Sequence, residues 1–372
     1  MIKVLFIFGT RPEAIKLAPV IKRLKNNNKF KTEVCVTAQH REMLDQVLEF
    51  FNINADYDLN IMTDNQSLFD ITASCVEKLE PVLRNSDPDL VIVQGDTTTA
   101  FISALAGFYL KKKVAHVEAG LRSFNKYSPF PEEINRVLIS HLADIHFAPT
   151  RKAKESLLRE GIKDNIYIVG NTVIDALFMA VDIVRDDRNK KYYTHFKEID
   201  LNKKLILVTG HRRESFGEPF KNICYALKEI ASNFCDVVEI VYPVHLNPNV
   251  RKPVFEILDG IENIHLIEPL PYDYLVWLMD KSYLILTDSG GIQEEAPSLN
   301  KPVLVMRNVT ERTEGIEAGT AKLVGTDKSV IVDTVSKLLL DENSYKSMSV
   351  AENPYGDGKS SERIEKIILE II

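Results

Sequence analysis

The fold class follows from residues 89–120, which read DLVIVQGDTTTAFISALAGFYLKKKVAHVEAG. The stretch begins and ends with short apolar runs, and the segment between them, Thr98–Leu110, has a helical pattern. Continuous apolar runs of this length are typical of strands buried in a parallel sheet, and helices connect such strands. Residues 89–120 therefore predict a β-α-β unit.

The same alternation of apolar runs and helical stretches continues along the whole chain. Further helical stretches include Pro12–Lys25 and Arg41–Phe51. The predicted strands of the first half are KVLFIFG, TEVCVTA, DLVIVQGD, KVAHVEAG, IHFAP and NIYIVG, and those of the second half are KLILVTGH, VVEIVYPVH, IHLIEP, YLILTDSGG, KPVLVM and AKLVG. The pattern predicts an α/β protein with two Rossmann-type, doubly wound parallel sheets.

The length of 372 residues fits two domains at about 150 residues each. We place the boundary after Gly170, which gives a first domain of residues 1–170 and a second domain of residues 171–357. The polar residues 185–204 predict a surface connection to the second sheet, and residues 358–372 form a final amphipathic helix that we expect to pack back on the first domain. Two such domains facing one another imply a ligand cleft lined by the carboxyl ends of both sheets.

The composition narrows the class of function. A net charge of −7 argues against a nucleic-acid binder, because a phosphate backbone selects basic surfaces. The four cysteines include no C-x-x-C pair, which predicts neither a disulfide framework nor a zinc site and fits a reducing cytoplasm. No apolar run approaches the length of a signal-peptide core or a membrane span.

Polar and charged residues follow the predicted strands at their carboxyl ends. Charged groups at a buried edge cost free energy unless a partner or a ligand compensates them. Five strand ends carry such groups, and we expect them to form one site: Gly9, Thr10, Arg11, Glu13 and Lys16; residues 95–99; residues 118–122; residues 211–214; and residues 289–295.

The first of these turns, FGTRPEAIK, combines a helix start with two cations. Thr10 as N-cap and Pro12 at the first helical position need no ligand. Arg11 and Lys16 do need a ligand, because the helix dipole opposes a cation near a helix N-terminus. A bound anion accounts for both.

The other strand ends each admit a structural interpretation as well. Asp96 suits a helix N-cap, whereas Glu118 before Ala-Gly has no evident structural role. His211 could be a core histidine, although the two arginines that follow it favour an anion site. The small residues Ser289–Gly291 would let backbone N–H groups face a phosphate, and a purely structural Gly-Gly turn is the alternative.

Several motifs are missing. The sixteen glycines spell neither G-x-G-x-x-G nor a Walker A loop, and no His/Cys cluster has metal-ligand spacing. The sequence therefore predicts no NAD site, no P-loop and no metal.

Taken together, the strand-end motifs resemble those of the non-hydrolysing UDP-N-acetylglucosamine 2-epimerases over almost the full chain. The motifs that carry the resemblance are FGTRPEAIKLAPV, TAQHREMLDQVL, GDTTT, HVEAGLRS, SPFPEEINR, GNTVIDAL, TGHRRES, HLNPNV, DSGGIQEEAP, KPVLVMRN and TERTEG. The resemblance implies a GT-B-like fold with the active site between two domains, often a homodimer, and interconversion of UDP-GlcNAc and UDP-ManNAc for surface polysaccharides.

The chemistry of that reaction favours elimination. The C2 hydrogen is not next to a carbonyl, and oxidation of a neighbouring hydroxyl would need the NAD fingerprint that this sequence lacks. Elimination of UDP to a 2-acetamidoglucal, followed by re-addition, needs acid/base groups around C2 and an anion clamp on the diphosphate.

The resemblance also implies a role for each site residue. The acidic trio corresponds to Asp96, Glu118 and Glu132, and the catalytic histidine to His211. The diphosphate would be held by Arg11, Lys16, His211, Ser289, Gly290 and Gly291, with Arg312 nearby, and the ribose by Glu295.

Bacterial members of this family are activated by a second UDP-GlcNAc, so the resemblance also implies an activator site at Gln39 and His40. Asn65 stands here where some members carry a basic residue, so activation stays open. Two other functions also stay open: a hydrolysing epimerase that releases ManNAc and UDP, and a GT-B glycosyltransferase.

Overall fold

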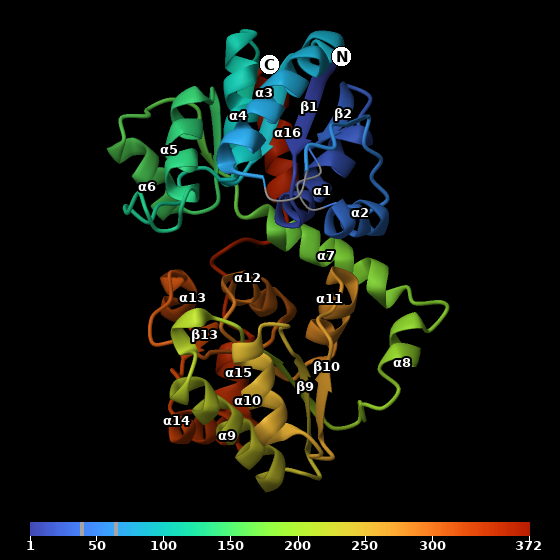
Figure 1. Cartoon of the computed structure of the whole chain (residues 1–372), viewed down its shortest axis with the longest axis vertical. Helices are drawn as coiled ribbons and strands as arrows, with labels where there is room; N and C mark the ends of the chain where they lie inside the picture. Colours follow the sequence, from blue (N-terminus) through green and yellow to red (C-terminus); the bar gives the residue numbers. More distant parts are fainter. Residues whose placement is uncertain (38–40, 63–65) are drawn as a thin grey trace. The chain divides into compact units, whose positions relative to one another are not determined.

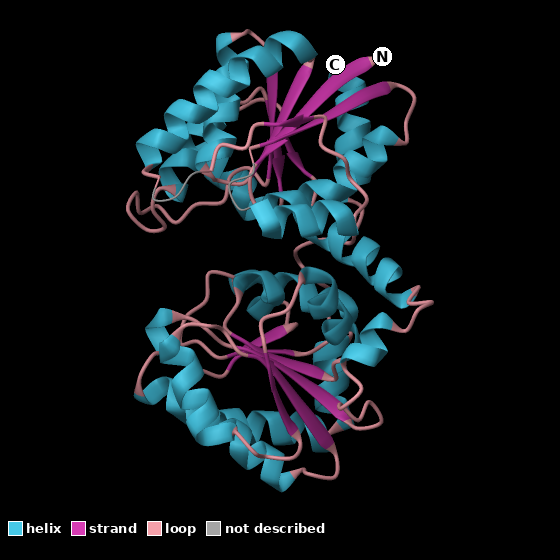
Figure 2. Cartoon of the chain, turned by 45° about the vertical axis from the view of Figure 1, so that its right-hand side comes forward, coloured by secondary structure: helices cyan, strands magenta, loops and turns pink. Residues whose placement is uncertain are grey.

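The computed structural model describes residues 1–37, 41–62 and 66–372, which form two compact units (Figure 1). Unit 1 comprises Met1–Met179 and Gly356–Ile372, and unit 2 comprises Ala180–Tyr355. In each unit, helices cover both faces of a sheet (Figure 2). The division falls inside helix α7 (Thr172–Arg185), later than the expected boundary at Gly170, because this helix continues without a break from one unit into the other.

The sheet of unit 1 is parallel, with strand order β3-β2-β1-β4-β5-β6-β7. Its strands are β1 (Ile2–Phe8), β2 (Phe30–Val36), β3 (Tyr57–Asp58), β4 (Leu90–Gln94), β5 (Lys113–Val117), β6 (Ile145–Ala148) and β7 (Ile166–Ile168). Its other helices are α1 (Arg11–Lys25), α2 (Arg41–Phe50), α3 (Leu68–Ser86), α4 (Thr98–Tyr109), α5 (Glu132–Leu142), α6 (Arg151–Arg159) and α16 (Ser360–Ile371). All five residues of β4 are buried, as expected for a strand with helices on both faces.

The sheet of unit 2 is also parallel, with strand order β10-β9-β8-β11-β12-β13. Its strands are β8 (Lys204–Thr209), β9 (Val238–Pro243), β10 (Ile264–Ile267), β11 (Leu284–Thr287), β12 (Val303–Val305) and β13 (Ala321–Leu323). Its helices are α8 (Lys191–His195), η1 (Arg213–Ser215), α9 (Glu218–Asn233), α10 (Pro248–Leu258), α11 (Tyr272–Lys281), α12 (Gly290–Glu295), η2 (Ala296–Leu299), α13 (Thr313–Glu317), α14 (Lys328–Leu340) and α15 (Glu342–Ser349).

Residues 185–204 form the largely exposed connection that their composition predicts. The prediction did not include its anchors: Tyr192 and Phe196 are buried, and both rings stack on Trp277 of α11, with centroid distances of 6.2 and 5.2 Å. Burying these large rings stabilises the connection against the rest of unit 2.

The C-terminal helix α16 packs beside α1 within unit 1 (Figure 1). The Asp175 carboxylate of α7 accepts hydrogen bonds from the N–H groups of Ser360 and Ser361, at 3.1 and 2.8 Å, and from the Ser361 hydroxyl at 2.7 Å. These are the N–H groups that a helix start leaves without a partner, so Asp175 caps α16 from another helix.

Each sheet changes winding direction at one point. In unit 1 the change lies between β1 and β4, and in unit 2 between β8 and β11. The turns that leave these four strands at their carboxyl ends are four of the five whose polar residues the sequence singles out, and the fifth follows β5, next to β4 in the sheet. Within the described residues, no helix is long and apolar enough to cross a membrane.

Candidate functional site

The turn between β1 and α1 is held by Glu13. Its Oε2 accepts hydrogen bonds from the N–H groups of Gly9 and Thr10, at 3.0 and 2.8 Å, and its Oε1 accepts one from the Thr97 hydroxyl at 2.7 Å. Burial raises the pKa of Glu13, and these hydrogen bonds oppose that shift. Glu13 therefore ties the turn after β1 to the turn after β4 and is a structural residue of the TRPE motif.

Arg136 of α5 joins the two carboxylates at the ends of β4 and β5. Its Nη2 pairs with Asp96 and lies 3.4 Å from Oε1 of Glu118, while its Nη1 donates to the backbone carbonyl of Glu118 at 2.6 Å. The neighbouring Asn135 donates from Nδ2 to the Asp96 carbonyl at 2.9 Å. One helix turn thus fixes both strand ends.

Lys16 of α1 pairs with Glu118 from another side. Glu118 is only 7% exposed, so its charge needs such partners: a carboxylate taken out of water costs several kcal/mol unless it is paired. We call Lys16, Asp96, Glu118 and Arg136 the carboxylate cluster. It contains two carboxylates and two cations, and each carboxylate pairs with at least one of the cations.

The backbone of β5 leaves its strand in an unusual conformation at Glu118. Its φ of +65° lies in the left-handed region, which costs a residue other than glycine about 1 kcal/mol or more. Gly120 follows with a φ of +88°, and a Cβ there would lie 2.2 Å from the Ala153 carbonyl oxygen. The conformation at Glu118 therefore directs its side chain out of the sheet. The backbone at Gly120 then passes close to α6.

Glu132 and Glu133 of the FPEE motif have different environments. Both oxygens of Glu133 accept backbone hydrogen bonds at 2.9 Å, from the N–H groups of Ser123 and Phe124, so Glu133 is structural. Oε2 of Glu132 is buried and has no hydrogen-bond partner in the part of the chain that the structure describes. Glu132 begins α5, one turn before Arg136 on the same face.

Sequence reasoning missed Arg136, although the residue stands in the SPFPEEINR motif. Its spacing of four from Glu132 was the available signal, because residues four apart share a helix face. Arg122, which the sequence placed among the strand-end charges, has a structural role instead. Its side chain is fully buried and donates to both oxygens of Glu160, at 2.6 and 2.7 Å, and to the Ser140 hydroxyl.

In unit 2, Asp288 organises the turn after β8. Its Oδ2 accepts hydrogen bonds from the N–H groups of His211 and Arg212, at 2.6 and 2.7 Å, and its Oδ1 lies 3.3 Å from Nδ1 of His211. Burial lowers the pKa of His211 and outweighs the opposing charge of Asp288. The His211 imidazole is therefore neutral near pH 7 and can donate or accept a hydrogen bond.

Ser289, Gly290 and Gly291, the glycine turn, follow β11. The Ser289 N–H donates to the Thr287 hydroxyl at 2.9 Å, and α12 begins at Gly290. Two predicted residues flank the turn: a Cβ on Gly290 would lie 3.7 Å from Cζ of Arg312, and one on Gly291 would lie 3.4 Å from Oε1 of Glu295. Arg312 also pairs with Glu294.

Three further sets of residues that the sequence predicts for the site remain to be placed: Arg11, Arg213 and the residues of the activator site. Arg11 is the first residue of α1, in the turn that Glu13 holds, and is partly buried. Arg213 lies exposed on η1. Gln39, His40 and Asn65, on which the activator site depends, lie outside the described residues.

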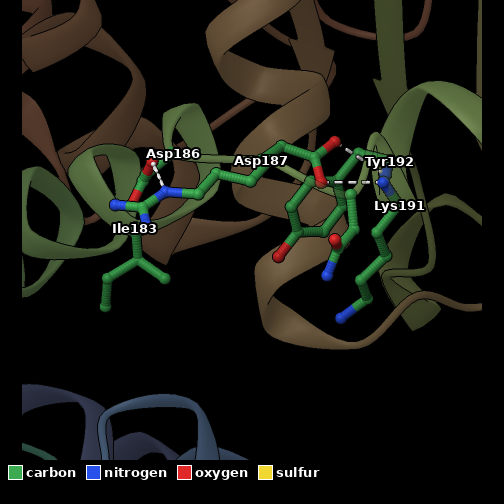
Figure 3. A pocket seen from close by; sticks show the side chains of 7 residues that line it. Ile183, Asp186, Asp187, Lys191 and Tyr192 are labelled. Carbon is green, nitrogen blue, oxygen red and sulfur yellow. Dashed lines mark hydrogen bonds and ion pairs between the residues drawn. The ribbon is translucent and has the colours of Figure 1, made fainter.

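A surface pocket of about 400 Å³ lies elsewhere in unit 2 (Figure 3). It is lined by Ile183, Asp186, Asp187, Arg188, Asn189, Lys191 and Tyr192. Asp187 accepts hydrogen bonds from the N–H groups of Lys191 and Tyr192, at 2.7 and 3.1 Å, and Asp186 pairs with Arg188 (Figure 3). These carboxylates stabilise the connection, so the pocket is not the candidate active site. Across residues 1–37, 41–62 and 66–372, no group of three or more His, Cys, Asp or Glu side chains is arranged to hold a metal ion.

Known proteins are similar to this chain in sequence and in fold. A family model described as UDP-N-acetylglucosamine 2-epimerase matches residues 22–369. The UDP-N-acetylglucosamine 2-epimerase of Escherichia coli K12 is 57% identical over 365 residues, which cover 97% of each chain. The UDP-GlcNAc 2-epimerase from Neisseria meningitidis, solved bound to UDP-GlcNAc, is 51% identical with a TM-score of 0.88, covering 99% of this chain and 100% of that one.

A more distant structure, Acinetobacter baumannii MurG, covers 100% of both chains with 15% identity and a TM-score of 0.57 and is similar in fold alone. Two parallel-sheet α/β units with these structural neighbours make the fold GT-B-like. The full-length matches and the two sheets agree on one conclusion. The chain belongs to the UDP-N-acetylglucosamine 2-epimerase family.

Proposed function

We propose that this protein interconverts UDP-GlcNAc and UDP-ManNAc and returns UDP to the sugar rather than releasing it, as a non-hydrolysing 2-epimerase. Membership of the 2-epimerase family and a relative solved with UDP-GlcNAc support the substrate. The carboxylate cluster supports the chemistry, because inversion at C2 requires proton transfer on both faces of that carbon.

The reaction proceeds by elimination and re-addition. A carboxylate removes the C2 proton, the C2–H electrons form the C1–C2 double bond of a 2-acetamidoglucal, and the C1–O bond breaks with its electron pair going to UDP. The UDP oxygen then adds back to C1 while a proton is delivered to the opposite face of C2. Asp96 and Glu118 carry this proton traffic, and Glu132, with its buried Oε2, shares it or orients the sugar.

The departing diphosphate needs an anion clamp, because negative charge develops on it as the C1–O bond breaks. We assign the clamp to cationic side chains and backbone N–H groups at the strand ends. Its members are Arg11, Lys16, His211, the backbone N–H groups of Ser289, Gly290 and Gly291, and Arg312. Glu295 accepts hydrogen bonds from the ribose hydroxyls.

One observation carries the proposal: Asp96 and Glu118, at the ends of adjacent strands, share the guanidinium of Arg136. Two carboxylates held against one cation suit a reaction that takes a proton from one face of a carbon and returns one to the other. A transferase needs a single base to activate its acceptor.

The deciding experiment is incubation of the purified protein with UDP-GlcNAc in deuterated water, followed by NMR. UDP-ManNAc carrying deuterium at C2 is the expected product. Free ManNAc and UDP would show a hydrolysing epimerase instead. An unchanged C2 proton with no product would leave a transferase and would overturn the proposal.

The proposal extends to the conditions in which the enzyme works. Elimination and re-addition need no redox partner, so we propose that the enzyme requires neither NAD nor a metal. We also propose that it is a cytoplasmic homodimer and that it makes a precursor of surface polysaccharides. Full activity after dialysis against EDTA is expected, and a loss that added Mg²⁺ restores would contradict it. Sigmoidal kinetics with UDP-GlcNAc would show that the second nucleotide sugar activates the enzyme through Gln39 and His40.

A further inference from the structure

His116 is a buried histidine that the sequence motifs do not explain. It lies in β5 between apolar, buried neighbours, and its own side chain is 0% exposed. A polar ring in such a place costs free energy unless it makes a hydrogen bond. The bond that the structure shows runs from Nε2 to the Gly95 carbonyl oxygen, at 2.7 Å.

The Gly95 carbonyl is a group that the sheet cannot satisfy. The ladder between β4 and β5 ends with Gln94 opposite Val117, and the Gly95 N–H makes one more bond to the Val117 carbonyl at 3.1 Å. At Gly95 the backbone turns with a φ of +73°, which carries its carbonyl out of the ladder. His116 donates to this carbonyl the hydrogen bond that a neighbouring strand would otherwise provide.

The next residue is Asp96, and its other polar groups are held as well. Asn135 binds its carbonyl, and Arg136 binds its carboxylate. Thr97 is in turn fixed by Glu13. From the side of the sheet, two hydrogen bonds hold this turn: the Gly95 N–H donates to the Val117 carbonyl, and His116 binds the Gly95 carbonyl. The second of these fixes the peptide group that leads into Asp96, so the direction of the Asp96 side chain depends on it.

We propose that His116 is a positioning residue for catalysis: by holding the Gly95 carbonyl, it fixes Asp96 in the orientation that proton transfer at C2 requires. This inference rests on the proposed role of Asp96. A displacement of about 1 Å in a catalytic group can lower the rate about 10²-fold. A buried histidine that holds this one carbonyl in place therefore has a benefit for catalysis.

The surroundings of His116 keep its ring neutral. Burial lowers its pKa to about 3, the nearby charge of Arg136 acts in the same direction, and the bond to Gly95 opposes them. His146 and Arg122 also disfavour a second proton. Because the carbonyl can only accept, the single proton sits on Nε2. Nδ1 is buried and has no hydrogen-bond partner among the described residues.

Substitutions at His116 separate the hydrogen bond from the packing of the ring. His116→Phe keeps a ring and loses the donor. His116→Gln keeps a donor, because its amide nitrogen is four bonds from Cα, as Nε2 of histidine is. His146→Phe is the matched control: His146 is buried and lies directly opposite His116 on β6, but no hydrogen bond joins it to the Gly95 carbonyl in the described structure.

We expect His116→Phe to lower kcat and deuterium incorporation at C2 by about 10- to 100-fold, with KM for UDP-GlcNAc within about twofold. His116→Gln should recover most of the loss, and His146→Phe should keep the wild-type kcat. Wild-type kcat in His116→Phe, or an equal loss in His146→Phe, would overturn the proposal.

A measurement on the wild-type protein covers the case in which His116→Phe does not fold. With ¹⁵N-labelled histidine, the His116 ring should show a proton on Nε2 and no titration between about pH 5 and 8. A proton on Nδ1, or titration near the ordinary value, would contradict the assignment. If Asp96→Asn keeps full C2 exchange, the proposed function of Asp96 is wrong, whereas the tautomer of His116 would be unaffected by that result.

Discussion

At the scale of single residues, the acidic side chains near the strand ends differ in how their oxygens are used. Glu13 and Glu133 accept backbone N–H groups on their carboxylates and hold turns in place. Asp96 and Glu118 accept charged donors instead, from Lys16 and Arg136. A carboxylate paired with charged side chains keeps oxygen lone pairs directed at polar side chains near the strand ends, whereas one bound to backbone N–H groups is used to hold its turn.

Arg136 is the residue on which the carboxylate cluster depends. Arg136→Met removes the cation between Asp96 and Glu118 while keeping much of the side-chain volume. We expect kcat to fall by about 10²- to 10³-fold, because the buried Glu118 and the partly exposed Asp96 then repel each other and lose their orientation. Arg136→Lys should recover only part, since an ammonium cannot bridge two carboxylates and a carbonyl with one planar group.

Steady-state kinetics and circular dichroism together test this expectation. Arg84→Met is the control, because Arg84 is exposed on α3 and, among the described residues, its ion pair is with Glu80 one turn away. A folded Arg136→Met protein that turns over at the wild-type rate would remove Arg136 from the site.

Glu13 should matter for stability. Glu13→Ala loses the hydrogen bonds to Gly9, Thr10 and Thr97, so we expect the free energy of unfolding to fall by about 2–4 kcal/mol in urea titrations. Glu13→Gln should cost less, about 1 kcal/mol, since an amide can accept from the backbone and donate to Thr97. An unchanged urea midpoint for Glu13→Ala would show that the turn does not need the carboxylate.

At the scale of elements, the Asp175 carboxylate caps the start of α16 in unit 1. Asp175→Ala leaves the N–H groups of Ser360 and Ser361 without their acceptor, and we expect a loss of about 1–2 kcal/mol. The loss should be local: hydrogen exchange should accelerate in residues 360–371. Glu362→Ala, an exposed change in the same first turn, is the control. Unchanged protection of α16 in Asp175→Ala would mean that its packing on α1 alone holds it.

Local patterns predicted most strands and helices, because a buried apolar run carries its own signal. They missed β3, whose two residues are too few to show a pattern, and the burial of Tyr192 and Phe196, which depends on Trp277 far along the chain. The site shows the same limit. Its strand-end residues were visible in the sequence, but Arg136 was not, because its partners lie 18 and 40 residues away.

At the scale of the whole molecule, the two units have the same type of architecture. Each is a parallel sheet that reverses its winding beside its first strand, and each carries its charged turns there. In unit 1 this arrangement also buries two histidines side by side, His116 on β5 and His146 on β6. Both lie near buried arginines, so neither can take up a proton without a large cost.

These two rings should make unit 1 sensitive to acid. Burial lowers the pKa of His116 to about 3 and that of His146 to about 4, from an ordinary value of 6.5. The unfolded chain therefore binds more protons than the folded chain below pH 6.5, and stability falls as the pH falls from there toward 4. At pH 5 each ring should cost about 2 kcal/mol relative to neutral pH. Urea unfolding followed from pH 7.5 to 5 measures this slope. His146→Phe, which removes one ring without touching the carboxylate cluster, should flatten it by about half, and an identical slope in that variant would show that other groups govern the acid sensitivity.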